Sequence, residues 1–178
     1  KHFDHELKNV HYFFAIGLIT GNHMIYRSIC SDYEWETLKF GYGWGLWGMA
    51  DSDGSTDKEE QIILVSYVDQ LRRQVLSSEE PFIGKDMELV TELTTDIIYN
   101  FPYFIRAYDA DKRPYDTGCI EIAEIFEKHK AGINSSVVEA YFESILFGMI
   151  KVAQASNGVD AAENQHYEII RNMLYKYH

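Results

Sequence analysis

The chain of 178 residues is 46% hydrophobic and 15% aromatic, which is typical of a globular domain and excludes a disordered or fibrous protein. Its 28 acidic residues outnumber the 16 lysines and arginines, so a formal net charge of −12 repels phosphate backbones and argues against nucleic-acid binding. We expect one domain over residues 1–178. The negative charge is consistent with binding a protein partner that has a basic patch or binding a cation, or it serves solubility alone.

The two cysteines, Cys30 and Cys119, stand far apart, without a CxxC motif or a cluster of histidines. Neither a zinc site nor a redox pair is therefore indicated, and the sequence leaves open whether the two are bonded. The longest weakly charged run, residues 10–26, falls short of the roughly 20 apolar residues that a membrane-spanning helix needs. We expect a cytoplasmic protein, close to a membrane only through a segment upstream of Lys1.

Three helices are expected in the first 50 residues. Asp4 can cap a helix that reaches about Thr20, and a short helix follows over 24–30. Ser31 and Glu34 have the spacing of a capping box, which opens a third helix toward residue 50. Glycines weaken a helix by roughly 1 kcal/mol each relative to alanine, so we expect neighbouring helices to approach this one closely. The glycines concerned are Gly41, Gly43, Gly45 and Gly48.

Residues 43–48 also match the dinucleotide fingerprint GxGxxG. That motif works only between a strand and a helix, and no strand pattern precedes it here. Two tryptophans, Trp44 and Trp47, fill the space that a pyrophosphate would need. We therefore reject a dinucleotide site.

Apolar residues at helical spacing predict further helices along the chain. The expected ranges are 57–77, 86–100, a helix ending at Gly132, one capped by Asn134 or Ser135, and one from Asp160. Phe101-Pro102 either ends the helix before it or starts a short one through Ala107. Residues 108–117 show no periodicity and are expected to form a loop that joins halves 1–107 and 118–178. No convincing strand pair occurs, so we predict an all-α multi-helix bundle.

The segments 52–61 and 156–165 repeat one pattern, a turn followed by the start of a helix. Asp53 and Asn157 each precede a glycine, which suits a turn. Thr56 with Glu59, and Asp160 with Glu163, have capping-box spacing. The repeat predicts two pseudo-symmetric helical halves.

The second of these turns, Ala-Ser-Asn-Gly-Val-Asp-Ala-Ala-Glu at 155–163, follows an apolar helix and resembles the TerB-like family, which is named for tellurite resistance. Residues 51–59 resemble that family less closely, with Ser55 at a position that is usually aliphatic. A similar module precedes the J-domain in some membrane-anchored co-chaperones. The resemblance implies two related helical halves and a stress-response or membrane-proximal scaffold with an acidic surface, sometimes proposed to bind metal, rather than a catalyst.

The polar residues of both turns form a candidate surface for a basic partner or a cation. Calcium binding is disfavoured, because Met49 stands where an EF-hand loop needs its first carboxylate. Glu163 and His166 form an ExxH pair, but no second ExxH completes a di-iron site. We expect a half-buried His166 with a local partner and no cofactor, and we leave metal binding open. The candidate residues are Asp51, Asp53, Asp57, Glu59, Glu60, Asn157, Asp160 and Glu163.

Aromatic residues are abundant in the first half, and they suggest either core packing or an exposed binding groove. The groove candidates are Tyr42, Trp44 and Trp47, because tryptophan and tyrosine are enriched at protein interfaces. No nucleophile elbow, local Cys/His pair or P-loop lysine is present, so nothing in the sequence favours an enzyme.

We therefore expect a non-enzymatic adaptor that binds another protein. One alternative is an immunity-type inhibitor that blocks a basic toxin or nuclease by charge complementarity. The other is a cation-binding stress protein.

Overall fold

The computed structural model describes residues 24–50, 64–69, 86–155 and 160–176, and the structural statements below refer to these residues. All regular secondary structure in these ranges is helical, and none of it is strand. This confirms the predicted all-α multi-helix fold.

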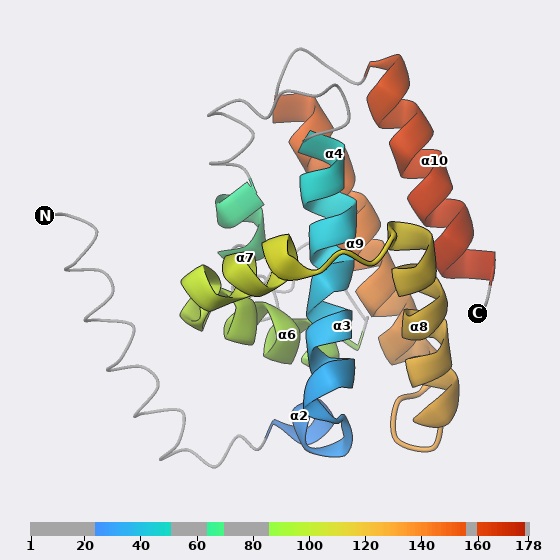
Figure 1. Cartoon of the computed structure of the whole chain (residues 1–178). Helices are drawn as coiled ribbons and strands as arrows, with labels where there is room; N and C mark the ends of the chain where they lie inside the picture. Colours follow the sequence, from blue (N-terminus) through green and yellow to red (C-terminus); the bar gives the residue numbers. More distant parts are fainter. Residues whose placement is uncertain (1–23, 51–63, 70–85, 156–159, 177–178) are drawn as a thin grey trace, which may run out of the picture.

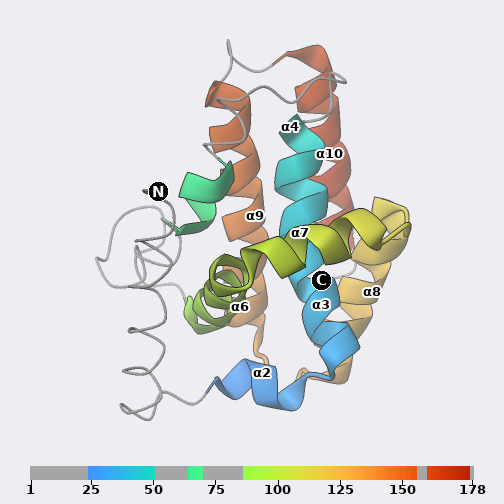
Figure 2. The ribbon, with the colours of Figure 1, turned by 60° about the vertical axis from the view of Figure 1, so that its left-hand side comes forward.

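One long helical stretch forms the centre of the molecule (Figure 1). It consists of α3 (Asp32–Tyr42), the π-helix η1 (Gly43–Trp47) and the short α4 (Gly48–Ala50), and it follows α2 (Ile25–Ile29). The helices α6 (Glu88–Tyr99), α7 (Phe101–Ala110), α8 (Tyr115–Lys128), α9 (Ser135–Ala155) and α10 (Ala161–Lys176) surround it, and residues 64–69 are also helical. Turning the molecule shows α7 crossing α3 (Figure 2).

Local side chains fix the predicted helix starts. Ser31 Oγ accepts a hydrogen bond from the Glu34 amide at 3.2 Å, and Glu34 Oε2 accepts one from the Ser31 amide at 2.8 Å. Asp160 and Glu163 form the same reciprocal pair, with both distances 2.8 Å. Asn134 Oδ1 accepts from the Val137 amide at 3.1 Å. These caps satisfy amides that have no partner inside the helix, and they confirm the expected helix starts.

The glycines of the central helix admit side chains from the helices around it. A Cβ atom at Gly41 would lie 2.1 Å from Tyr141 Oη of α9, and one at Gly43 would lie 2.3 Å from Tyr108 Cε2 of α7. Gly45 and Gly48 are approached in the same way, by Ile145 of α9 and His166 of α10. The expectation of close helix contacts is thereby confirmed, and it explains why a helix of low intrinsic propensity forms here.

The expected loop at residues 108–117 is wrong in its boundaries. Helix α7 continues to Ala110 and α8 begins at Tyr115, so only residues 111–114 lie outside helices. The helix continues because the Tyr108 ring packs into the core, stacked on Phe104 at 6.1 Å between ring centroids. Pro114, with φ near −58°, occupies the N-cap position of α8, where its fixed φ suits a helix start.

Helix α9 is 21 residues long and supplies much of the core. Buried hydroxyls in this region all have partners: Tyr42 Oη lies 2.8 Å from Ser144 Oγ, and Tyr141 Oη donates to the Leu38 carbonyl at 2.7 Å. Burial raises the pKa of both phenols, so they stay neutral. Despite this apolar character, no helix within the described ranges has the length and hydropathy to cross a bilayer.

Candidate functional site

Of the residues predicted for the acidic turns, the structure describes only Asp160 and Glu163. Residues 51–60 and Asn157 lie outside the described residues, so a cation site there stays a prediction. Asp160 is exposed at the start of α10. Glu163 is buried and is engaged in the cap with Asp160 instead of joining an acidic surface. Among the residues that the structure describes, no group of three or more histidine, cysteine or acidic side chains is placed to hold a metal ion.

The aromatic groove predicted around Tyr42, Trp44 and Trp47 is not found, because these residues belong to the core. Tyr42 is fully buried and Trp44 is 6% exposed. Trp47 is partly buried and packs against the core, with its ring centroid 5.8 Å from that of Phe104. The glycines next to these aromatic residues bring other helices over them, which closes the space that a groove would occupy.

His166 is half-buried, as expected, but its partner is not local. Its Nε2 lies 3.1 Å from the Trp44 carbonyl oxygen, so the ring N–H donates across from α10 to the π-helix. The Tyr115 ring stands edge-on to the imidazole at 5.9 Å. Glu163, the other member of the ExxH pair, is engaged in the helix cap. The pair is therefore structural.

Both cysteines are buried and free. Burial is the main cause that raises the pKa of Cys30 to about 11 and that of Cys119 to about 12. Neither side chain forms the thiolate that a nucleophile or a metal ligand requires at neutral pH.

The structure does contain a groove, at the corner where α7 crosses the first half of α3. We call it the α3–α7 groove; its volume is about 550 Å³. Tyr33 of α3 is 58% exposed there, and Tyr103 of α7 is 54% exposed. The lining residues are Arg27, Asp32, Tyr33, Glu36, Phe40, Tyr103, Ala107, Ala110, Asp111 and Arg113.

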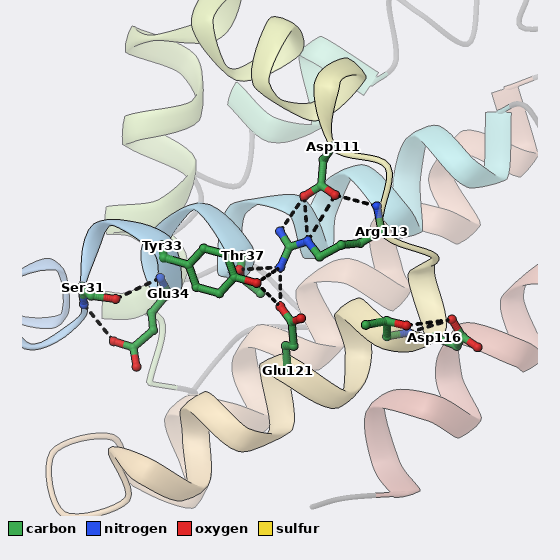
Figure 3. Close-up of polar contacts among 9 residues, drawn as sticks. Ser31, Tyr33, Glu34, Thr37, Asp111, Arg113, Asp116 and Glu121 are labelled. Carbon is green, nitrogen blue, oxygen red and sulfur yellow. Dashed lines mark hydrogen bonds and ion pairs between the residues drawn. The ribbon is translucent and has the colours of Figure 1, made fainter.

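Arg113 fixes one wall of this groove (Figure 3). Its Nε donates to both carboxylate oxygens of Asp111, at 3.1 and 2.9 Å. One terminal nitrogen donates to Tyr33 Oη at 2.8 Å and to Thr37 Oγ1 at 3.1 Å, and also pairs with Glu121 of α8. The guanidinium thus joins α3, α8 and the 111–114 segment, and it lies 5.0 Å from the centroid of the Tyr33 ring.

The pKa values of Asp111, Arg113 and Tyr33 are all shifted away from neutral pH. Burial opposes ionisation of Asp111, but hydrogen bonds from Arg113 outweigh it and lower the pKa of that carboxyl. Burial likewise opposes the charge of Arg113, and its carboxylate partners raise the pKa of the guanidinium. A hydrogen bond to Glu121 raises the pKa of Tyr33. Asp111 and Arg113 therefore keep their charges at neutral pH, and they form charge-assisted hydrogen bonds with each other.

A second ionic cluster lies beside the groove, around the buried ammonium group of Lys39. Its Nζ is 2.7 Å from Glu36 Oε1 and 2.9 Å from Asp96 Oδ2. Asp96 also accepts hydrogen bonds from Trp35 Nε1 and Asn100 Nδ2. Glu36 Oε2 is buried without a hydrogen-bond partner. Every other buried side-chain nitrogen or oxygen of the described residues has one. Glu36 also lines the groove, although its Oε2 itself is buried.

Another groove, of about 570 Å³, runs between α9 and α10. Its lining is mostly apolar and aromatic, and it includes Leu146, Phe147, Ile150, Tyr167 and Tyr175. Tyr175 is 40% exposed, so it provides a control position on a different surface.

Comparisons of the chain with protein-family models, curated proteins and solved structures give no match. The TerB-like resemblance therefore stays a prediction. The residues that define the α3–α7 groove were not found by sequence reasoning, because Arg113 and its partner Tyr33 are 80 positions apart and neither belongs to a motif.

Proposed function

We propose that the chain is a non-enzymatic, all-α adaptor that binds another protein in the cytoplasm, and that the α3–α7 groove is its binding surface. The observation that carries the proposal is the pairing of Tyr33 and Tyr103, each more than half exposed, along one groove. Tyrosine and arginine are enriched at binding hot spots because they offer a large contact area together with hydrogen bonds.

The rigidity of the groove supports this role. Tyr33 is held through its hydroxyl by Arg113, which is itself held by Asp111 and Glu121. A side chain that is already ordered loses less entropy when a partner binds, so more of the contact energy contributes to affinity. The ionic groups are paired with one another, which suits recognition better than proton transfer.

A role as a TerB-like scaffold in a stress response belongs to the same proposal, and only the turn sequences at 51–59 and 155–163 support it. The cytoplasmic location is supported by the two free thiols, since disulfides are rare in that compartment.

An immunity-type inhibitor of a basic toxin or nuclease is the second candidate, and the net charge of −12 favours it. Charge of this kind speeds association with a basic enzyme, and the rate then falls steeply as salt is added. The identity of the captured partner separates the two candidates: a toxin or nuclease whose activity is lost on binding supports the inhibitor.

Site-specific photo-crosslinking in the native cells tests the proposal. A benzoylphenylalanine residue replaces Tyr103 in one variant and Tyr175 in a control, and adducts are identified by mass spectrometry. We expect one recurrent protein adduct at position 103 and none of that protein at position 175. The proposal fails if position 103 gives no adduct, or if both positions capture the same proteins equally.

A further inference from the structure

We propose that the α3–α7 groove receives an arginine side chain from a basic segment of the partner protein. The inference rests on the proposed function, because it names the chemistry of the partner at the same groove. Three features carry it: the charge of the groove, the unfilled acceptor on Glu36, and the exposed tyrosine rings.

The first feature is the balance of charge. Three carboxylates line the groove, on Asp32, Glu36 and Asp111, against two guanidinium groups. Both guanidinium groups are already engaged: Arg27 pairs with Asp32, and Arg113 pairs with Asp111. An anionic ligand would therefore have to break an existing ion pair. Carboxylates are in excess here because Glu36 shares the single ammonium group of Lys39 with Asp96, so a cation is favoured within a chain of net charge −12.

The second feature is Glu36. Its Oε1 is held by the buried Lys39, and its Oε2 is buried without a partner. A buried carboxylate oxygen that lacks a donor is unfavourable, so a ligand that donates to it gains more than one that meets a satisfied group. The side chain as a whole is 27% exposed while Oε2 itself is buried, so a donor in the groove reaches this oxygen once the carboxylate turns toward the groove.

The third feature is aromatic, and it favours arginine over lysine. The groove already contains one guanidinium in contact with a tyrosine ring, since Arg113 lies 5.0 Å from the Tyr33 ring centroid. With 58% of Tyr33 and 54% of Tyr103 exposed, ring surface remains for a second guanidinium. The planar guanidinium stacks on rings while its N–H groups donate to a carboxylate, whereas an ammonium group is a compact and strongly hydrated charge.

Fluorescence anisotropy with defined peptides tests the inference. The probe is a labelled peptide of four Arg-Gly repeats at about 0.15 M salt, near the physiological ionic strength. Two matched peptides carry citrulline, the neutral isostere, or lysine in place of arginine. We expect the intact protein to bind the arginine peptide, to bind the lysine peptide more weakly and to show no binding of the citrulline peptide.

The variant Glu36→Gln removes the charge at the unfilled acceptor and is expected to weaken binding of the arginine peptide about tenfold, the loss of one charge-assisted hydrogen bond. Glu139→Gln makes the same change at an exposed position of α9 outside the groove and is expected to stay within about twofold of the parent protein. Circular dichroism establishes that each variant is folded. Should Glu36→Gln not fold, Tyr103→Ala is compared with Tyr175→Ala, and only the former is expected to weaken binding.

Equal binding of the citrulline and arginine peptides overturns the inference, as does an equal effect of the groove and control variants. If a partner crosslinks at position 103 but shows no dependence on Glu36 or on arginine, the arginine site is wrong while the adaptor function stands. If position 103 captures nothing, both proposals fall.

Discussion

Gly118 of α8 lies directly against the indole ring of Trp44: a Cβ atom at position 118 would be 2.2 Å from Trp44 Cη2. The indole is enclosed on its other sides by the Phe40 ring, at 6.1 Å between centroids, and by the Arg113 guanidinium, at 5.5 Å. The small residue on α8 thus sets how closely that helix approaches the π-helix.

Gly118→Ala is expected to lower the free energy of unfolding by about 2 kcal/mol, because the added methyl group overlaps a buried ring that has little room to move. Helix propensity alone predicts the opposite sign, since alanine favours a helix by about 1 kcal/mol over glycine. Urea denaturation measures the difference. Gly132→Ala is the control, because its nearest neighbour is the flexible end of Ile29 at 3.2 Å. A Gly118→Ala protein as stable as the parent would contradict the packing argument.

His166 should make stability depend on pH. Burial lowers the pKa of its imidazole, and the hydrogen bonds to the π-helix backbone only partly offset that effect. The folded state therefore binds this proton less readily than the unfolded state, so the neutral ring supports full stability above about pH 6.5 and stability declines as the pH falls below that value.

The His166 effect is measured by comparing the parent protein with His166→Gln at pH 7.5 and pH 5.5. We expect the parent to lose stability over this interval by more than the variant does. Parallel losses in the two proteins would show that the imidazole does not titrate differently in the folded state.

Glu34 should make the stability of the fold fall in acid. Burial opposes its ionisation, but hydrogen bonds from Lys128, Ser31 and His129 lower its pKa to about 2. A carboxyl with a depressed pKa stabilises the fold above its ordinary pKa of about 4.5 and loses that contribution as the pH falls toward 2. We expect Glu34→Gln to cost about 2 kcal/mol at pH 7 and nearly nothing at pH 2, as measured by thermal unfolding. A cost that is the same at both pH values would assign the effect to packing.

Arg113 should tolerate neither removal nor replacement by lysine. Its planar fork binds Asp111 through two nitrogens while it also reaches Tyr33 and Glu121, and an ammonium group cannot make both sets of bonds. We expect Arg113→Lys to lower the free energy of unfolding by about 2 kcal/mol, and Arg113→Met by about 3 kcal/mol, because two carboxylates are then left without their cation.

The pairing is tested by adding Asp111→Asn to Arg113→Met. The double variant is expected to recover part of the loss, because one of the stranded charges is removed. Additive losses would show that the two side chains do not act as a pair.

Local interactions account for the parts of the fold that could be predicted from the sequence. The caps at Ser31 and Asp160 involve residues three positions apart, so their spacing is visible in the sequence. The glycines of the central helix also predicted close contacts from the sequence, because each glycine lowers the stability of the helix that contains it. Which side chains fill those spaces could not be predicted, because they come from α7, α9 and α10.

The α3–α7 groove could not be predicted from the sequence, because the residues that form it lie far apart in the chain. Residues 108–117 are rich in charge and contain a proline, which is the usual composition of a loop, yet Tyr108 is drawn into the core and lengthens α7. For Tyr42 and Trp44 the sequence leaves core packing and a groove as alternatives, because aromatic residues occur in both. Their burial follows from the packing of other helices, which no local pattern records.

The glycine-lined central helix also bears on how the domain unfolds. Each of the four glycines weakens this helix by roughly 1 kcal/mol relative to alanine, so residues 32–50 depend on α7, α8, α9 and α10 for their helical form. Those helices in turn lose a shared packing surface when the central helix is removed. The described helices are therefore mutually dependent, and their melting should be one cooperative transition with no stable fragment on either side of residues 111–114.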